Sequence, residues 1–88
     1  MFTMYKYQFE FAKEVTIEMP EGPTMLSAQL QNGAPCLWAM VNTENDNKAY
    51  KLACYWTGEE ITNADQLRFI ATIQAADNLV WHIFEQYI

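Results

Sequence analysis

The dipeptide Asn32-Gly33 constrains the fold most strongly, because it joins two runs of alternating apolar residues within positions 24–41. Asn and Gly tolerate the positive φ angles that a two-residue type I′ turn requires at both central positions. The pattern therefore predicts a β-hairpin with a defined register. The expected facing pairs are Gln31 with Ala34, Leu30 with Pro35, Ala28 with Leu37, and Leu26 with Ala39.

The two faces of this hairpin differ in chemistry, since side chains alternate between the faces of a strand. One face is apolar and is expected in the core; it carries Leu26, Ala28, Leu30, Leu37 and Ala39. The other face mixes polar and apolar side chains, namely Ser27, Gln29, Gln31, Cys36, Trp38 and Met40. We expect any function of the hairpin to be displayed on this mixed face.

Five other segments show the alternation of half-buried strands, which brings the expected number of strands to about seven. They lie at residues 2–11, 14–19, 49–57, 68–74 and 79–86, with a second hairpin turn at 75–78. Thr62 or Asn63, followed by Asp65, allows at most one short helical turn near residues 62–67. Short connections favour a single all-β domain over residues 1–88, an antiparallel meander forming a small sandwich or barrel.

Eleven acidic and five basic residues give the chain a net charge of −6. The basic residues are scattered, so direct nucleic-acid binding is not expected, because phosphate neutralisation needs clustered Lys and Arg. An acidic surface either serves solubility or suits a basic protein partner. Glu14, Glu18 and Glu21 form the candidate acidic flank of such a surface.

The expected location is the cytoplasm. No apolar run is long enough to span a membrane, and the start MFTMYKYQFEF lacks the features of a signal peptide. Cys36 and Cys54 are then expected to be free thiols on neighbouring strands. Two Cys and one His without a CxxC spacing do not form a zinc site, so no metal is expected.

No motif for catalysis or for a cofactor appears. His82 lies on an apolar predicted strand, which is typical of a hydrogen-bonded structural histidine. Glu10, Glu14, Glu18 and Glu21 are regularly spaced, but alternation places them on solvated strand faces rather than in an acid–base pair. We therefore expect a non-enzymatic protein without a cofactor.

Aromatic residues are in surplus, because Trp38, Tyr55 and Trp56 fall on adjacent predicted strands and alternation cannot bury all three. Exposed Trp, Tyr and Met are enriched at the centres of protein interfaces. The candidate contacts are Gln29, Trp38, Met40 and Tyr55. Alternatively, Trp38 covers the second layer of a sandwich. Unpaired edge strands invite pairing, so a homo-oligomer, a dimer, is also expected.

The run TIEMPEGPTMLSAQLQNGAPCLWAMVNTE resembles a family of short phage-encoded proteins of unknown function. That family has an aromatic N-terminal strand, an IEMP-G turn, a Q-NG-P-LWA-V hairpin, a central Gly and a final HIFE-like strand. The matching positions are Ile17, Glu18, Met19, Pro20, Gly22, Gln29, Gln31, Asn32, Gly33, Pro35, Leu37, Trp38, Ala39, Val41, Gly58, His82, Phe84 and Glu85. Residues 42–48 and 59–66 depart from the pattern. The resemblance implies phage or prophage origin and carries no activity.

Together these features favour a non-enzymatic phage accessory protein that binds and blocks a host or defence protein through an acidic, aromatic surface, in the cytoplasm of an infected bacterial host. One alternative is a protein that sequesters a small nucleotide signal at a subunit interface, with aromatic stacking and with Arg68 or Lys51 on the phosphate. Another is a structural or assembly protein of the virion.

Overall fold

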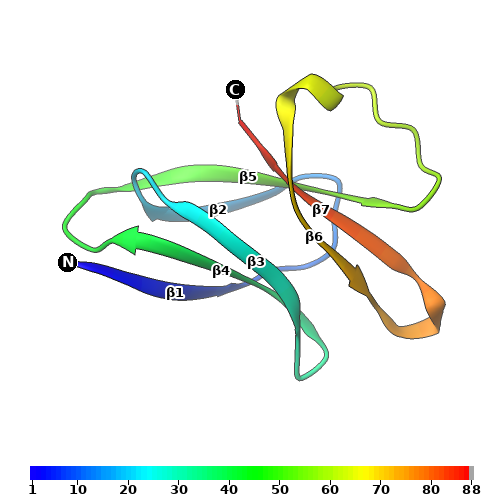
Figure 1. Cartoon of the computed structure of the whole chain (residues 1–88), viewed down its shortest axis with the longest axis horizontal. Helices are drawn as coiled ribbons and strands as arrows, with labels where there is room; N and C mark the ends of the chain where they lie inside the picture. The colour runs from blue at the N-terminus through cyan, green and yellow to red at the C-terminus, as the bar shows by residue number, and fades with distance from the viewer. Residues whose placement is uncertain (88) are drawn as a thin grey trace.

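The structure is a computed structural model that describes residues 1–87. Two antiparallel sheets face each other as an open sandwich rather than a closed barrel (Figure 1). The three-stranded sheet has the order β1-β4-β3 and contains β1 (Phe2–Gln8), β4 (Ala34–Asn42) and β3 (Thr24–Gln31). The four-stranded sheet has the order β2-β5-β7-β6 and contains β2 (Val15–Pro20), β5 (Asn47–Trp56), β7 (Val80–Gln86) and β6 (Leu67–Gln74). The predicted all-β class is confirmed.

The order of the strands differs from the expected meander. Strands that follow one another in the chain pair with each other only in the β3–β4 and β6–β7 hairpins, within the part of the chain described. The connections β1–β2, β2–β3 and β4–β5 each pass from one sheet to the other, so these strands do not pair. Alternation cannot reveal this, because a strand with one buried face shows the same pattern in either layer of a sandwich.

The β3–β4 hairpin turns at Asn32-Gly33 as predicted. The φ angles are 53° at Asn32 and 83° at Gly33, and both are positive as a type I′ turn requires. Three of the four expected pairs are present: Gln31 with Ala34, Leu30 with Pro35, and Ala28 with Leu37.

The fourth expected pair, Leu26 with Ala39, is wrong. A β-bulge between Met25 and Ser27 adds one residue to β3, so Met25 faces Ala39 and Leu26 is 45% exposed. A bulge shifts the alternation of side chains, which moves Leu26 from the core side to the outer side. Met25 packs against the core in its place.

The core lies between the two sheets and is apolar. Completely shielded inward residues of the central strands are Leu37, Ala39 and Val41 of β4 and Leu52 and Cys54 of β5. Among residues 1–87, leaving aside Asp77, no polar or charged residue is buried. Apolar burial is therefore the main source of stability of the sandwich. The buried cluster comprises Phe9, Met19, Ala28, Leu37, Ala39, Val41, Leu52, Cys54, Ile73 and Ile83.

β1 ends at Gln8, three residues before the predicted limit of 2–11. The N–H of Phe9 still donates to the carbonyl of Pro35 at 3.0 Å, but Pro35 has no N–H to return a bond. Phe11 instead stacks on the ring of Trp81 in the four-stranded sheet, with ring centroids 4.9 Å apart. The chain thus leaves the first sheet here.

Two short 3-10 turns complete the described chain. The turn η1 (Ala64–Gln66) falls within the helical turn predicted near residues 62–67. A second turn, η2 (Ala76–Asn78), was not expected; it forms the connection of the predicted β6–β7 hairpin. Asn78 there has a φ of 63°, which Asn tolerates better than most residues.

Candidate functional site

The outer face of the three-stranded sheet carries apolar side chains that the core does not use. Phe2 and Met4 of β1 are 67% and 65% exposed, Met40 of β4 is 40% exposed, and Leu26 lies at the bulge of β3. Trp38, half-buried, lies on the central strand of the same face. We call these five residues the apolar outer face. A contiguous exposed apolar patch on a small protein commonly marks an interaction site.

The pairing of the strands brings these side chains together. Met4 lies directly opposite Met40 across β1 and β4. Trp38 is the next outward residue along β4, with Lys6 of β1 on one side and Ser27 of β3 on the other. A large aromatic residue therefore lies in the middle of this face, where interface hot spots concentrate.

The end of this face nearest the hairpin turn is polar. Gln8 and Gln29 flank Cys36 on the two sides of β4. The ammonium of Lys6 donates a hydrogen bond to Oε1 of Gln31 at 2.6 Å. Because β4 lies between β1 and β3, this bond spans the central strand. The face therefore has an apolar end and a polar end, like the core and rim of a protein interface.

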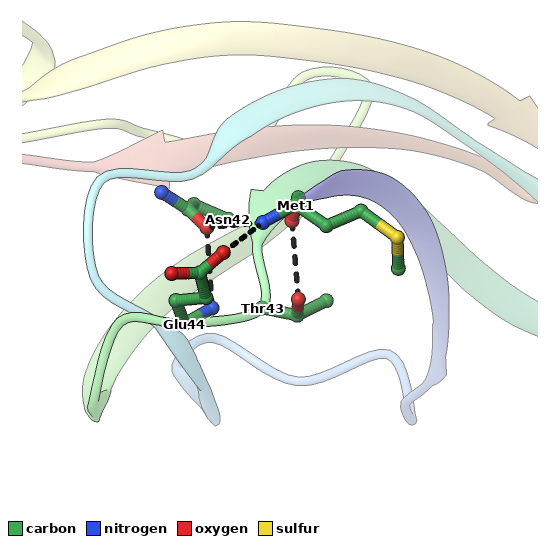
Figure 2. A network of polar contacts seen from close by, with 4 residues as sticks. All are labelled: Met1, Asn42, Thr43 and Glu44. Carbon is green, nitrogen blue, oxygen red and sulfur yellow. Dashed lines mark hydrogen bonds and ion pairs between the residues drawn. The ribbon is translucent and has the colours of Figure 1, made fainter.

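Hydrogen bonds around Met1 hold the apolar end in place (Figure 2). The terminal ammonium of Met1 lies 3.1 Å from Oδ1 of Asn42 and 2.8 Å from Oε2 of Glu44. Thr43 donates to the carbonyl of Met1 from its backbone N–H at 2.8 Å and from its hydroxyl at 3.1 Å. The loop after β4 thus fastens the start of β1 to the end of β4.

The predicted contact residues are divided between two opposite faces of the sandwich. Gln29, Trp38 and Met40 share the outer face of the three-stranded sheet, so Trp38 does not lie between the two layers. Tyr55 lies on the outer face of the four-stranded sheet, because the adjacent Cys54 points into the core. The expected single surface that joins Tyr55 to Trp38 is therefore wrong, since β4 and β5 belong to different sheets.

Two residues of the predicted acidic flank also lie on the four-stranded sheet. Glu14 precedes β2 and Glu18 is within it, and both are exposed beside inward residues of that strand. Oε1 of Glu14 is 3.6 Å from the ammonium of Lys51, so its charge is partly compensated. Glu14 and Glu18 therefore do not border the apolar outer face.

The third acidic residue, Glu21, has a different position, in the β2–β3 turn. Its carbonyl accepts a hydrogen bond from the side-chain amide of Asn45, in the loop after β4, at 2.8 Å. Its carboxylate is 3.6 Å from the ammonium of Lys48. Glu21 thus lies near the end of β4 that carries the apolar residues, but it already has a cationic neighbour.

His82 has the structural role that its surroundings predicted. Its Nε2 lies 2.8 Å from the hydroxyl of Thr57, and its Nδ1 lies 3.0 Å from the hydroxyl of Thr72. Both ring nitrogens are therefore engaged within the four-stranded sheet. Neither is available to a substrate without breaking one of these contacts.

A shallow hollow of about 300 Å³ opens beside β5 and the end of β7, with Lys51, Glu85 and Tyr87 in its lining. Lys51 pairs with Glu14, and Arg68 lies 3.9 Å from Glu85. The two cations suggested for a nucleotide phosphate therefore already have carboxylate neighbours. A carboxylate beside each cation partly offsets the attraction of that cation for a phosphate group.

A cluster without a signal in the sequence surrounds Lys13, in the β1–β2 connection. Its ammonium lies 3.9 Å from the centre of a Trp56 ring and 5.6 Å from that of Trp81. It also pairs with Glu59 and donates to the carbonyl of Cys54 at 3.3 Å. These partners lie 41 or more residues away along the chain, so periodicity could not find the cluster.

Both cysteines are free and buried, as free thiols were expected. They lie on β4 and β5, in different sheets, so the expectation of neighbouring strands is wrong. Burial raises the pKa of the Cys54 thiol, and this effect exceeds the opposing influence of the Ala12 backbone and of Lys13. Within residues 1–87, no three His, Cys, Asp or Glu side chains gather where they could hold a metal ion.

The fold and this face define a small β-sandwich with an exposed apolar sheet face. The chain belongs to the family described as Domain of unknown function (DUF7352), which matches residues 1–88. No curated protein and no solved structure matches the chain. In the region that the structure covers, no helix has the length and apolar character needed to cross a membrane.

Proposed function

We propose that this protein is a non-enzymatic binding protein whose apolar outer face docks onto another protein. The observation that carries the proposal is the contiguity of exposed Met4 and Met40 with Trp38 on one sheet face. Leaving these side chains in water costs free energy that a partner would recover, at about 25 cal/mol for each Å² of apolar surface buried. Methionine side chains suit such a surface because they adapt to irregular partners.

The polar end of the face would supply orientation. Gln29 is exposed, and the linked pair Lys6 and Gln31 offers both a cation and amide groups at the edge of the apolar patch. Polar groups at a rim fix register and exclude wrong partners more than they add affinity. A partner with an apolar centre and a hydrogen-bonding edge fits this arrangement.

The acidic character of the chain would act at longer range. The net charge is −6, while Glu14 and Glu18 lie on the other sheet. Their field can raise the rate of encounter with a basic protein without contact at the interface, and this effect weakens as salt screens the charges. A basic partner is therefore favoured.

The biological setting that we propose is that of a phage accessory protein. The resemblance of the hairpin and of the IEMP-G turn to short phage-encoded proteins supports this setting. The protein would then block a host or defence protein in the cytoplasm of an infected bacterium, by occupying the surface that this target uses.

Capture of partners from host lysate by the purified protein tests the proposal. Met40→Glu places a charge beside Trp38 on the apolar outer face and should weaken capture at least tenfold, as expected for a hot spot. Phe69→Glu is the control, since Phe69 is also an exposed apolar residue but lies on the four-stranded sheet, outside the proposed site. Equal capture by the wild type and by Met40→Glu would contradict the proposal, as would loss only in Phe69→Glu.

A further inference from the structure

We propose that two copies of this chain pair through β1, antiparallel and in a register centred on Tyr5, to form one continuous six-stranded sheet. This inference goes beyond the proposed function and does not depend on it. It specifies which edge of the sandwich associates, which residues face each other, and which backbone groups form the new hydrogen bonds.

The first observation is the orientation of the backbone of β1. The bonds from Thr43 to the carbonyl of Met1 and from Phe9 to the carbonyl of Pro35 show that odd-numbered residues direct their backbone groups toward β4. In an antiparallel ladder the residues between them direct theirs away from the partner strand. The free edge of β1 therefore presents the outward N–H and C=O groups of Phe2, Met4, Lys6 and Gln8.

The second observation is that one symmetric register satisfies all of these groups. Centred on Tyr5, it pairs Phe2 with Gln8 of the second copy and Met4 with Lys6 of the second copy, and the two-fold axis repeats both pairs. A register centred on Met4 leaves Gln8 unpaired. A register centred on Lys6 leaves Phe2 without a partner in the strand and sets two lysines opposite each other, which is unfavourable.

The side chains of β1 agree with this register. Tyr5 is 43% exposed even though its alternation places it on the inner side, toward Tyr7, with which it makes an edge-to-face contact. In the dimer Tyr5 would face Tyr5 of the second copy in a non-hydrogen-bonded pair, the type in which side chains approach most closely. β1 contains no acidic residue, so the net charge of −6 is not concentrated at this edge.

The other described sheet edges are less suitable. β2 ends in Pro20, and proline opposes edge pairing because it has no N–H to donate. β3 and β6 contact each other, so these two edges partly cover one another. By contrast, β1 is an uncovered edge strand whose start is fastened to the loop after β4 by the hydrogen bonds of Met1 (Figure 2). The end of β1 that would pair with Gln8 of the second copy is therefore held in position before association.

Solution mass is the first test, measured by light scattering or sedimentation across protein concentrations. The wild type should show twice the monomer mass. Met4→Pro removes an outward N–H but no bond to β4, and proline is tolerated on an edge strand whose N–H faces solvent. It should weaken dimerisation at least tenfold, whereas Met4→Ala, which keeps the N–H, should remain a dimer. A monomeric wild type, or a Met4→Pro variant that dimerises as well as wild type, overturns the proposal.

Disulfide trapping tests the register without relying on the stability of the proline variant. Tyr5→Cys should form a disulfide-linked dimer on mild oxidation, because residues in non-hydrogen-bonded pairs have Cα atoms about 4.5 Å apart. Lys6→Cys is the control, because residue 6 faces residue 4 of the second copy. Crosslinking of Lys6→Cys but not of Tyr5→Cys overturns the register. Oxidation of the wild-type protein shows how much disulfide-linked dimer comes from the buried Cys36 and Cys54.

These outcomes are separate from those of the binding proposal. The dimer uses the backbone edge of β1, whereas partner capture uses side chains on the outer face of the sheet. A monomer that still captures a partner would overturn the dimer alone, and a dimer that captures nothing would overturn the binding proposal alone.

Discussion

The ammonium of Lys13 lies 3.9 Å from the centre of a Trp56 ring, and it also pairs with the carboxylate of Glu59. Lys13 belongs to the connection through which the chain passes from the first sheet to the second, and Trp56 is the last residue of β5. One side chain therefore fastens the crossing between the sheets to the end of a central strand and to the loop that follows it.

Lys13→Ala should lower the free energy of unfolding by about 0.5–1 kcal/mol, the usual range for a cation–π contact that water partly reaches. The side chain of Lys13 is 46% exposed, which argues against a larger effect. Lys13→Arg should retain most of the stability, because a guanidinium also binds indole faces. Urea denaturation measures the free energy of unfolding of both variants. A Lys13→Ala variant as stable as wild type would show that the contact contributes nothing.

Gly33→Ala should destabilise the protein by about 1–2 kcal/mol, the cost of placing an L side chain in the left-handed region. Gly33 has a φ of 83°, and no atom lies within 4 Å of an added Cβ, so the cost comes from the backbone and not from a clash. Gly33→Asn should cost less, since Asn visits this region more readily. Thermal unfolding compares the stability of the two variants. Equal losses of stability would point to an effect other than the φ angle of residue 33.

Leu37→Ala and Met40→Ala test the assignment of the two faces of β4. Leu37 is completely buried, so its truncation leaves a cavity and should cost about 2–5 kcal/mol. Met40 is on the exposed face, so its truncation should change stability by less than about 1 kcal/mol. Chemical denaturation measures the free energy of unfolding of both variants. A larger loss of this free energy for Met40→Ala than for Leu37→Ala would mean that the face of Met40 is covered.

Cys54 should make stability fall at alkaline pH. Its pKa is raised in the folded protein above the ordinary value of 9.0, so the folded state holds the proton longer than the unfolded chain does. The stabilisation is therefore complete below pH 9 and is lost as the pH rises through the folded pKa. Burial also raises the pKa of Tyr7, which acts in the same direction at higher pH.

The contribution of Cys54 can be separated by comparing wild type with Cys54→Ala between pH 8 and 10. The loss of unfolding free energy with pH should be smaller in the variant, because the buried thiol is gone while Tyr7 remains. The thiol of folded wild type should also react slowly with alkylating reagents until denaturant exposes it. Identical pH profiles for the two proteins would argue against a titrating buried thiol.

Local features of the sequence were enough to predict the seven strands, the Asn32-Gly33 turn and most of the register of the hairpin. They did not predict that Leu26 faces away from the core. Either Met25 or Leu26 can fill the apolar position, and only packing against the second sheet selects between them. The prediction that the contact residues share one surface was wrong for a related reason. Trp38 and Tyr55 both alternate correctly on their own strands, but alternation does not tell which sheet a strand joins.

The sequence by itself determined where the chain is extended, where it turns and which side of most strands is apolar, because these properties depend on side-chain period and on φ preferences within a few residues. The tertiary structure decided the strand order, the bulge at Leu26, the Lys13 cluster and the separation of Trp38 from Tyr55. These depend on contacts between residues far apart in the chain, whose free energy exists only once both sheets have formed.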